Sequence, residues 1–406
     1  MISDIIRMYG TTWCNDCKRA KKFFGEHRVR YDFIDVDEDR EGLRIVEDIN
    51  QGKRIIPTIV FPDGSMLVEP SNAELATKLG LQTRPECPFY DLAIVGGGPS
   101  ALTAAIYAAR EGIDTLVVER SALGGQAGIT ERLDNYPGFP EGVGGAEFAD
   151  RLVAQCRRFG VELLSATEVV AVGSDGADRW IRLASGDEIR GRAVLLAPGS
   201  TYQRLGVPGE EDFIGAGVHF CATCDGPFYR DQDVLVVGGG NSAVEEGIFL
   251  TRFARHVTIV TRAARLTASK VAQEKALAHP QISVEYETTV AGFRGDKRLA
   301  VVVLRNVHTG ETRDITPAAV FVFIGLRPNT GFLAGAVTLD ERGFIVTDAT
   351  LQTSVPGIFA VGDARTGSTK QLVSAAGEGA TAALMIRRHL EQAKVLAPRW
   401  AEAMDG

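Results

Sequence analysis

Two pairs of cysteines have the spacing of redox-active dithiols. Cys14 and Cys17 lie near the start of the chain, and Cys221 and Cys224 lie near its middle. The Cys-x-x-Cys spacing is typical of dithiols that exchange electrons with disulfides. The second pair stands between two glycine-rich segments that resemble nucleotide-binding loops. The sequence therefore predicts an electron path that enters at one nucleotide, passes through the second and leaves as a reduced cysteine pair.

The two glycine-rich segments are each typical of a dinucleotide-binding loop. Each follows an apolar strand and precedes a helix, the context in which such a loop holds a pyrophosphate at the helix N-terminus. The glycines permit the tight turn and the close approach of the backbone to the phosphates. Two loops in this context make accidental glycine turns a poor explanation. The residues predicted to hold nucleotides are Gly96, Gly98 and Ala101 in the first loop and Gly238, Gly240, Ser242 and Ala243 in the second.

The residue after the next strand distinguishes the two nucleotides. Glu119 stands 23 positions after Gly96, where a carboxylate can bind both ribose hydroxyls of an adenosine that lacks a 2′-phosphate. The same interval in the second loop reaches Thr261, followed by Arg262 and Arg265, whose guanidinium groups can bind a phosphate. The first loop therefore predicts FAD and the second NADPH. The alternative is that Arg262 and Arg265 are ordinary solvent-exposed side chains that do not bind the nucleotide.

Composition limits the remaining possibilities. The 406 residues are 45% apolar and 24% charged, which suits a globular protein with two or three cores. A net charge of −8 disfavours a nucleic-acid partner. The chain shows no apolar run of membrane length, and Met1–Asp4 lacks the features of a signal peptide, so we expect a cytoplasmic protein without a membrane partner.

The cysteines do not indicate a metal site. A zinc site built from both pairs is disfavoured because about 200 residues separate them, whereas zinc ribbons bring their pairs within about 20. For the two single cysteines, Cys87 and Cys156, we expect structural roles. A disulfide framework is not expected in a reducing compartment.

The elements that must position these residues indicate an α/β protein. Residues 1–81 alternate as β-α-β-α-β-β-α, the short form of the thioredoxin fold, and their last helix begins with a capping box of Ser71 and Glu74. Two βαβ units begin near Tyr90 and Val234. The predicted domains are a glutaredoxin-like domain at 1–81, a stiff two-proline linker at 82–88, a discontinuous FAD domain at 89–205 and 328–406, and an NADPH domain with the central cysteines at 206–327.

The second and larger part of the chain resembles the low-molecular-weight thioredoxin reductases. The resemblance covers residues from about 89 to 392 and rests on motifs in family order. These are the loop at 96–101, Gly124-Gly125-Gln126, Asn135-Tyr136-Pro137-Gly138, Ala197-Pro198-Gly199, the Cys221–Asp225 segment, the loop at 238–243 with Glu245-Glu246, and Gly362-Asp363-Ala364.

The resemblance implies further site residues and a homodimer. By the family pattern, Gly124, Gln126, Asn135, Asp363 and Gln371 lie around FAD. Asp225, which follows the second cysteine, moves protons for the dithiol in that family. The family is homodimeric and rotates its nucleotide domains between two arrangements.

Three segments depart from the family pattern. The usual His-Arg-Arg-x-x-x-Arg is replaced by residues 261–267, in which Arg262 keeps its register and Arg265 offers compensation, so we expect only a modest preference for NADPH. The usual Ala-Thr-Gly reads Ala197-Pro198-Gly199, and Arg-Gln-Ala reads Lys370-Gln371-Leu372. The last change is expected to shift the flavin potential.

Residues 1–81 resemble glutaredoxins, and mycoredoxins most of all. Trp13 precedes Cys14, which begins a helix whose dipole is expected to lower the thiol pKa. Ile56-Pro57 matches the cis-proline that faces the dithiol. The glycine pair that helps glutaredoxins hold glutathione is replaced by residues 68–72, so we expect mycothiol or a protein disulfide as the substrate.

Three functions are consistent with these features. The favoured one is an NADPH-dependent disulfide reductase that reduces its own Cys14–Cys17 pair or a separate thioredoxin. A flavoprotein reductase dedicated to a peroxiredoxin is the alternative, although such enzymes usually carry a doubled thioredoxin fold. A third hypothesis gives residues 1–81 a binding role, either docking or holding an iron–sulfur cluster.

Overall fold

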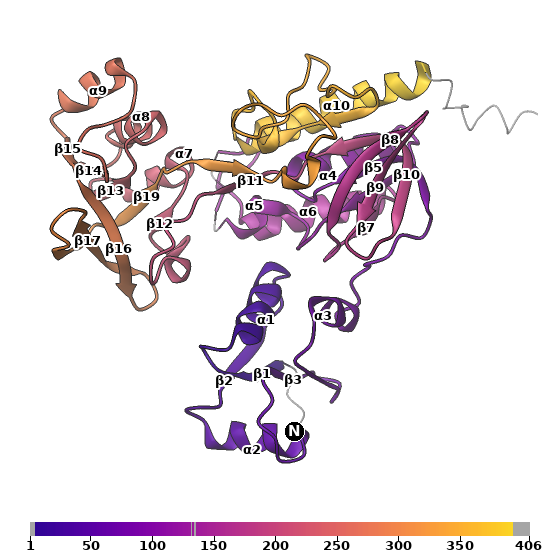
Figure 1. Ribbon diagram of the computed structural model, residues 1–406, viewed down its shortest axis with the longest axis horizontal. Helices are drawn as coiled ribbons and strands as arrows, with labels where there is room; N and C mark the ends of the chain where they lie inside the picture. The colour runs from indigo at the N-terminus through magenta and orange to yellow at the C-terminus, as the bar shows by residue number, and fades with distance from the viewer. Residues whose placement is uncertain (1–4, 131, 134, 393–406) are drawn as a thin grey trace, which may run out of the picture. The chain divides into compact units, whose positions relative to one another are not determined.

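The computed structural model describes residues 5–130, 132–133 and 135–392 (Figure 1). The chain divides into two compact units. The first comprises Met1–Ile129, Gly145–Gly199 and Thr330–Gly406, and the second comprises Thr130–Gly144 and Ser200–Asn329. No helix in the described ranges combines the length and hydrophobicity that crossing a bilayer requires.

The N-terminal part of the first unit is a four-stranded sheet with three helices. Its elements are β1 (Ile6–Gly10), α1 (Asn15–Glu26), β2 (Tyr31–Asp35), α2 (Arg40–Ile49), β3 (Thr58–Val60), β4 (Met66–Val68) and α3 (Asn72–Lys78). The strand order is β2-β1-β3-β4, with β1 parallel to β2 and antiparallel to β3. The observed succession of elements is the β-α-β-α-β-β-α series predicted from the sequence.

The apolar pattern of α1 explains its packing. Cys17, Ala20, Phe23 and Phe24 recur every three or four residues, and all four are buried. Burying each phenylalanine ring contributes about 2 kcal/mol to the stability of the fold. The helix is therefore fixed against the sheet by the same face that carries Cys17. The predicted capping box of α3 is confirmed, because Glu74 N–H donates to Ser71 Oγ and Ser71 N–H donates to Glu74 Oε2.

The rest of the first unit is a seven-stranded sheet with helices. The helices and strands are β5 (Phe89–Val95), α4 (Pro99–Arg110), β6 (Thr115–Val118), α5 (Gly125–Ile129), α6 (Gly145–Arg158), β7 (Glu162–Leu164), β8 (Val169–Asp175), β9 (Asp178–Leu183), β10 (Glu188–Leu196), β21 (Ile358–Ala360) and α10 (Leu372–Gln392). The order is β7-β6-β5-β10-β9-β8, and β21 pairs with β10 in parallel. The late strand β21 thus joins a sheet whose other strands end near residue 196.

Helix α10 packs closely on helix α4. A Cβ added at Gly379 of α10 would lie 2.2 Å from the carbonyl oxygen of Ser100 in α4, so only glycine permits this approach. Gly362, just after β21, also faces Ser100, whose Oγ would lie 2.7 Å from an added Cβ. The C-terminal segment is therefore held against the first turn of α4.

The second unit contains its own parallel sheet. Its elements are β11 (Ser200–Tyr202), β12 (Val218–His219), α7 (Ala222–Asp225), the 3₁₀ helix η2 (Gly226–Tyr229), β13 (Asp233–Val237), α8 (Asn241–Leu250), β14 (His256–Val260), α9 (Lys270–Leu277), β15 (Ile282–Glu285), β16 (Thr288–Gly295), β17 (Leu299–Asn306), β18 (Thr312–Ile315), β19 (Ala319–Val322) and β20 (Leu326–Pro328). The parallel order is β12-β19-β13-β14-β15, and β16, β17 and β18 form an antiparallel sheet. The segments that enter and leave this unit pair as β11 and β20.

The segment predicted as a linker is hydrogen-bonded to the β7 edge of the seven-stranded sheet. Glu162 of β7 accepts from the side chain of Gln82 and from the backbone N–H of Glu86, each at 2.8 Å. Ser165 N–H donates to the carbonyl of Gln82 at 3.0 Å, and Thr167 Oγ1 donates to that of Thr83 at 3.2 Å. Much of the segment therefore follows the sheet instead of crossing open space.

Candidate functional site

The N-terminal cysteines lie at the beginning of α1. Cys14 is the N-cap residue, and its Sγ accepts a hydrogen bond from the backbone N–H of Cys17 at 3.1 Å. Its Sγ also lies 3.8 Å from the carbonyl oxygen of Ile56, which precedes a cis peptide bond to Pro57. The structure thus brings together the dithiol and the proline as the sequence predicted. Both cysteines are free thiols.

The two thiols differ in their surroundings. Cys17 is fully buried, and a Cβ added at Gly10 of β1 would lie 2.6 Å from its Sγ, so the strand needs glycine there. Burial and the hydrogen bond with the Cys14 side chain raise the pKa of Cys17 to about 12. Cys14 retains a small exposed fraction at the helix N-terminus. This arrangement favours Cys14 as the attacking sulfur and Cys17 as the resolving one.

Trp13 exposes an apolar surface next to Cys14. Its side chain is 64% exposed, and its indole N–H donates to Asp37 Oδ2 at 2.9 Å. Arg54 forms an ion pair with the same carboxylate. The ring is therefore held in place beside the dithiol, where a substrate could contact it.

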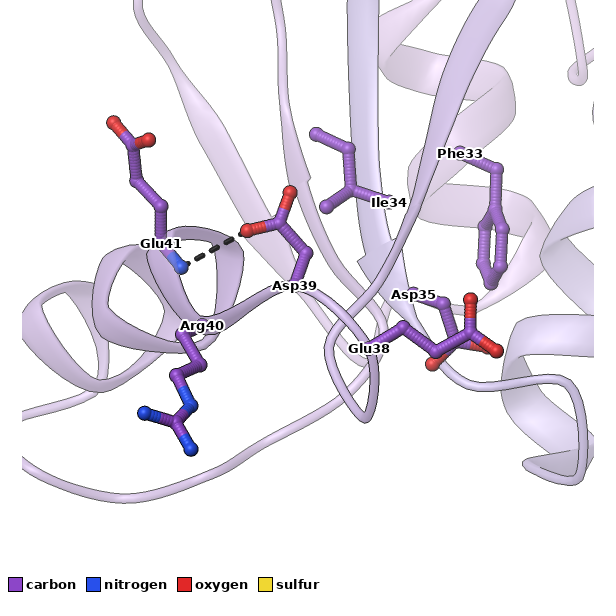
Figure 2. A pocket seen from close by; sticks show the side chains of 7 residues that line it. All are labelled: Phe33, Ile34, Asp35, Glu38, Asp39, Arg40 and Glu41. Carbon is purple, nitrogen blue, oxygen red and sulfur yellow. Dashed lines mark hydrogen bonds between the residues drawn. The ribbon is translucent and has the colours of Figure 1, made fainter.

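A shallow acidic pocket lies at the end of β2 and the start of α2 (Figure 2). The side chains that line it are Phe33, Ile34, Asp35, Glu38, Asp39, Arg40 and Glu41. Asp39 caps α2 by accepting from the backbone N–H of Glu41 at 2.9 Å, which Figure 2 shows as a dashed line. No predicted site residue lines this pocket. We assign it no role in the chemistry.

The first glycine loop is built as a nucleotide cradle. Gly96 has a φ of +105°, and an added Cβ would lie 2.2 Å from the carbonyl oxygen of Ala197. Gly98 caps α4 without any side-chain hydrogen bond, and a Cβ added there would meet no atom within 4 Å, so the helix N-terminus has room for a phosphate. Ala101 is fully buried one turn later. These features fit the pyrophosphate of a dinucleotide.

Glu119, predicted from the sequence to bind a ribose, lies beside the first glycine loop. It follows β6, and its Oε2 accepts from Gly97 N–H at 2.6 Å while its Oε1 accepts from Ser121 N–H at 2.8 Å. Gly124 N–H donates to the carbonyl of Gly97 at 2.8 Å. The structure therefore gathers Glu119 and Gly124 at the first glycine loop. Gln126 follows in α5, where its side chain is exposed.

The C-terminal residues of the predicted flavin site form a second cluster. Asp363 follows Gly362, which packs against Ser100 of α4. Burial raises the pKa of the Asp363 carboxyl. Lys370 Nζ donates to the backbone carbonyls of Asp363 and Arg365, at 2.5 and 3.3 Å. Lys370, noted in the sequence only as a departure, thus fastens the turn that carries Asp363. Gln371 directly precedes α10. Asn135 belongs to residues 130–144 of the second unit.

The second glycine loop repeats the geometry of the first without the carboxylate. A Cβ added at Gly238 would lie 2.4 Å from the carbonyl oxygen of Phe323 and 2.8 Å from Cβ of Ala243. One added at Gly239 would lie 2.5 Å from Oγ1 of Thr261, the position that Glu119 occupies in the first loop. Gly240 caps α8 without a side-chain bond. The loop therefore fits a second dinucleotide.

Arg262 and Arg265 lie on the exposed segment after β14. Neither guanidinium forms an ion pair or hydrogen bond with any residue in the described part of the chain. The same segment folds over the glycine loop, because Thr267 N–H donates to the carbonyl of Gly239 at 2.7 Å. Ser242 is exposed in the first turn of α8. Both arginines are thus available to an anionic ligand of this loop.

The central cysteines lie at α7 in the second unit. Cys221 is half-buried and disulfide-bonded. The side chain of Cys224 lies outside the described residues, although its backbone belongs to α7. Asp225 Oδ2 lies 3.4 Å from Nδ1 of His219, and Nε2 of that ring lies 2.7 Å from Oη of Tyr229. Neither His219 nor Tyr229 was singled out from the sequence, because nothing local in the sequence pairs them with Asp225.

Comparisons with known proteins identify the families of two parts of the chain. The family described as pyridine nucleotide-disulphide oxidoreductase matches residues 90–379, and the glutaredoxin family matches residues 6–66. The thioredoxin reductase of Treponema pallidum (strain Nichols) is 42% identical over 294 residues, covering 72% of this chain and 95% of that protein. That of Mycolicibacterium smegmatis is 43% identical over 305 residues, covering 75% and 97%.

A solved structure shows the same relationship. The thioredoxin reductase from Streptococcus pyogenes MGAS5005 superimposes with a TM-score of 0.72 at 38% identity, over 75% of this chain and 99% of that one. The matched proteins therefore correspond to about three quarters of the chain. The chain belongs to the thioredoxin reductase family of pyridine nucleotide-disulphide oxidoreductases, which contain FAD and use NADPH, and it carries a glutaredoxin domain at its N-terminal end.

Proposed function

We propose that this enzyme uses NADPH to reduce the Cys221–Cys224 disulfide and passes the electrons on to Cys14 and Cys17. FAD, when bound, supplies two-electron exchange between a hydride donor and a dithiol. The Cys14–Cys17 pair would then reduce a disulfide outside the chain. The observation that carries this proposal is the complete redoxin site: Cys14 Sγ accepts the Cys17 N–H at a helix N-terminus, beside Ile56 and the cis-proline, in the same chain as a reductase.

The cofactor residues follow from the two loops. Gly96, Gly98 and the start of α4 would hold the FAD pyrophosphate, and Glu119 would bind the adenosine ribose. Asp363, fastened by Lys370, would lie at the flavin end of the site together with Gln126, Asn135 and Gln371. The second loop, with Gly238, Gly240, Ser242 and Ala243, would hold NADPH, with Arg262 and Arg265 at its 2′-phosphate.

Fusion raises the effective concentration of the redoxin, provided that its tether permits the encounter. The bonds from Gln82 and Glu86 to Glu162 shorten the free part of that tether. Electron transfer to the redoxin would occur within one chain, or in a homodimer in which one subunit reduces the redoxin of the other. The homodimer and a cytoplasmic location remain part of this proposal.

The final substrate is proposed to be mycothiol-linked or a protein disulfide, including a thioredoxin-like one. Support comes from residues 68–72, which replace the glycine pair of glutathione-binding glutaredoxins. The segment places Val68 at the surface and gives Glu69 a φ of +47°. The single four-stranded sheet at 5–81 gives less support to a reductase dedicated to a peroxiredoxin, for which a doubled fold is usual.

Substitution of Cys14 tests the proposal. Cys14→Ser removes the attacking sulfur of the redoxin, so NADPH-driven turnover of small mixed disulfides should fall to the slower rate that the central pair supports alone, while NADPH still reduces the flavin. Cys87→Ser, which removes an exposed free thiol of the linker, is the matched control and should leave turnover unchanged. Wild-type turnover by Cys14→Ser would show that the redoxin domain is a docking module or a passenger and that the central pair serves a separate thioredoxin.

A further inference from the structure

His219 contacts Asp225 around the segment that carries both central cysteines. It ends β12 two residues before Cys221, whereas Asp225 ends α7 one residue after Cys224. Nδ1 of His219 lies 3.4 Å from Oδ2 of Asp225, and their side chains are 7% and 19% exposed. The contact therefore joins the two ends of the redox segment through largely buried groups.

Tyr229 fixes the other side of the imidazole ring. Its Oη lies 2.7 Å from Nε2 of His219, and Phe321 of β19 packs against both rings at centroid distances of 5.4 and 6.0 Å. One tautomer satisfies both polar contacts, because Nδ1–H can face the carboxylate while Nε2 accepts from the tyrosine hydroxyl. The titratable groups that the described elements place against the ring are Asp225 from α7 and Tyr229 from η2, and β19 contributes the neutral Phe321.

We propose that His219 is a positioning residue for thiol–disulfide exchange at the central pair. It holds the Asp225 carboxyl in the orientation from which that group protonates the leaving sulfur, and Tyr229 holds the ring. The inference rests on the proposed function, because Asp225 has this role only if the central pair reduces a substrate disulfide. A side chain held by packing and by a second hydrogen bond loses less orientational freedom in the reaction.

The proposed step balances in protons and electrons. A thiolate of the central pair attacks one substrate sulfur, the substrate S–S bond breaks, and the leaving thiolate takes the proton of the Asp225 carboxyl. The second thiol of the pair then returns a proton to the Asp225 carboxylate, attacks the mixed disulfide and forms the Cys221–Cys224 bond. The second product leaves as a thiolate and takes its proton from water. Two electrons have moved from the dithiol to the substrate.

Two substrates with different leaving groups separate positioning from general damage. The full chain carrying Cys14→Ser and Cys17→Ser is reduced with dithiothreitol, desalted and mixed with bis(2-hydroxyethyl) disulfide or 4,4′-dithiodipyridine. An alkyl thiolate leaves slowly without a proton, whereas the pyridyl sulfur is a good leaving group that needs none. His219→Phe keeps an aromatic ring but removes both nitrogens. The substitution should slow the reaction with the alkyl disulfide about tenfold, which is less than the usual loss when a general acid itself is removed. It should slow the reaction with the pyridyl disulfide less than about twofold.

Further variants identify Asp225 as the group through which His219 acts. Asp225→Asn should show a larger loss with the alkyl disulfide, and adding His219→Phe to it should cause no further loss. Tyr229→Phe removes only Oη and should slow the alkyl reaction about threefold, so it carries the test if His219→Phe does not fold. His219→Asn, whose amide can donate to the carboxylate, should restore part of the rate. His256→Phe, which removes a half-buried histidine bonded to Ser283, is the control and should change neither rate.

Specific outcomes overturn the inference. Equal losses with both disulfides would mean that His219 only shapes the segment, and additive losses in the Asp225→Asn background would mean that it does not act through Asp225. Failure of the proposed function itself would give different experimental results. In that case NADPH would not reduce the flavin of the wild-type protein, or its dithiol would react with neither disulfide.

Discussion

The backbone N–H of Cys17 donates a hydrogen bond to Sγ of Cys14 across 3.1 Å at the first turn of α1. The bond directs the positive end of an amide dipole at one sulfur, while the other sulfur is fully buried next to Gly10 of β1. One turn of helix thus produces one thiol that is 9% exposed and one that is fully buried. This asymmetry is the chemical basis of the proposed terminal redox step.

The reactivity of Cys17 should follow its raised pKa. Since the thiolate is the reacting form and the pKa is about 12, only about one molecule in ten thousand carries a Cys17 thiolate at pH 8. Iodoacetamide at pH 8 should therefore modify Cys14 and spare Cys17, and the rate at Cys17 should rise about tenfold per pH unit up to about pH 12. Peptide mass mapping after timed labelling measures both rates. Equal labelling of the two cysteines at pH 8 would contradict this description of the site.

Glu119 should contribute to FAD affinity through the adenosine half of the cofactor. Glu119→Ala removes the acceptor of the Gly97 and Ser121 amides and the predicted ribose contact, so we expect the dissociation constant for FAD to rise at least about tenfold. Affinity for FMN, which lacks adenosine, should change much less. Fluorescence titration of the flavin-free protein measures both constants.

The control for that measurement is Glu111→Ala, which removes a half-exposed carboxylate from the far end of α4, where it pairs with Arg387. It should leave both dissociation constants unchanged. If Glu119→Ala weakened FAD and FMN equally, the carboxylate would support the loop without touching the nucleotide.

The sequence located the residues whose positions depend on local structure. A strand, a glycine turn and a helix place Gly96, Gly98 and Glu119 by short-range geometry, and the helix that follows Cys14 places both thiols. Such residues could be predicted because the same few residues determine both the turn and the site.

Contacts made by the tertiary fold could not be predicted in the same way. His219 reaches Asp225 only because β12, α7 and η2 fold around the redox segment. The two prolines indicated a stiff linker, but they gave no sign of Glu162, which lies 76 residues after Glu86 and binds it. Lys370 likewise donates to the carbonyl of Asp363, and its own backbone has a φ of +58°, a conformation that the sequence does not indicate.

Arg262 should discriminate weakly between the two nicotinamide nucleotides. It is exposed, so its attraction to a 2′-phosphate is screened by solvent and should be worth less than about 1 kcal/mol. Arg262→Ala is therefore expected to raise the KM for NADPH about threefold and to leave the KM for NADH unchanged, as steady-state assays with both nucleotides would show. Arg255→Ala, an equally exposed arginine paired with Asp233, should change neither value. Parallel changes with NADPH and NADH would leave Arg262 as a solvated side chain.

The route of the electrons can be read directly from the cysteines. The fully oxidised protein is mixed anaerobically with stoichiometric NADPH, quenched in acid at timed intervals, alkylated after denaturation and mapped by mass spectrometry. In the wild type, label at Cys14 and Cys17 should appear after flavin reduction. In Cys221→Ser, NADPH should still reduce the flavin, but the N-terminal pair should stay unlabelled, because the proposed path runs from the flavin through the central disulfide to the redoxin. Label confined to Cys221 and Cys224 in the wild type, or label at Cys14 in Cys221→Ser, would contradict the proposed path.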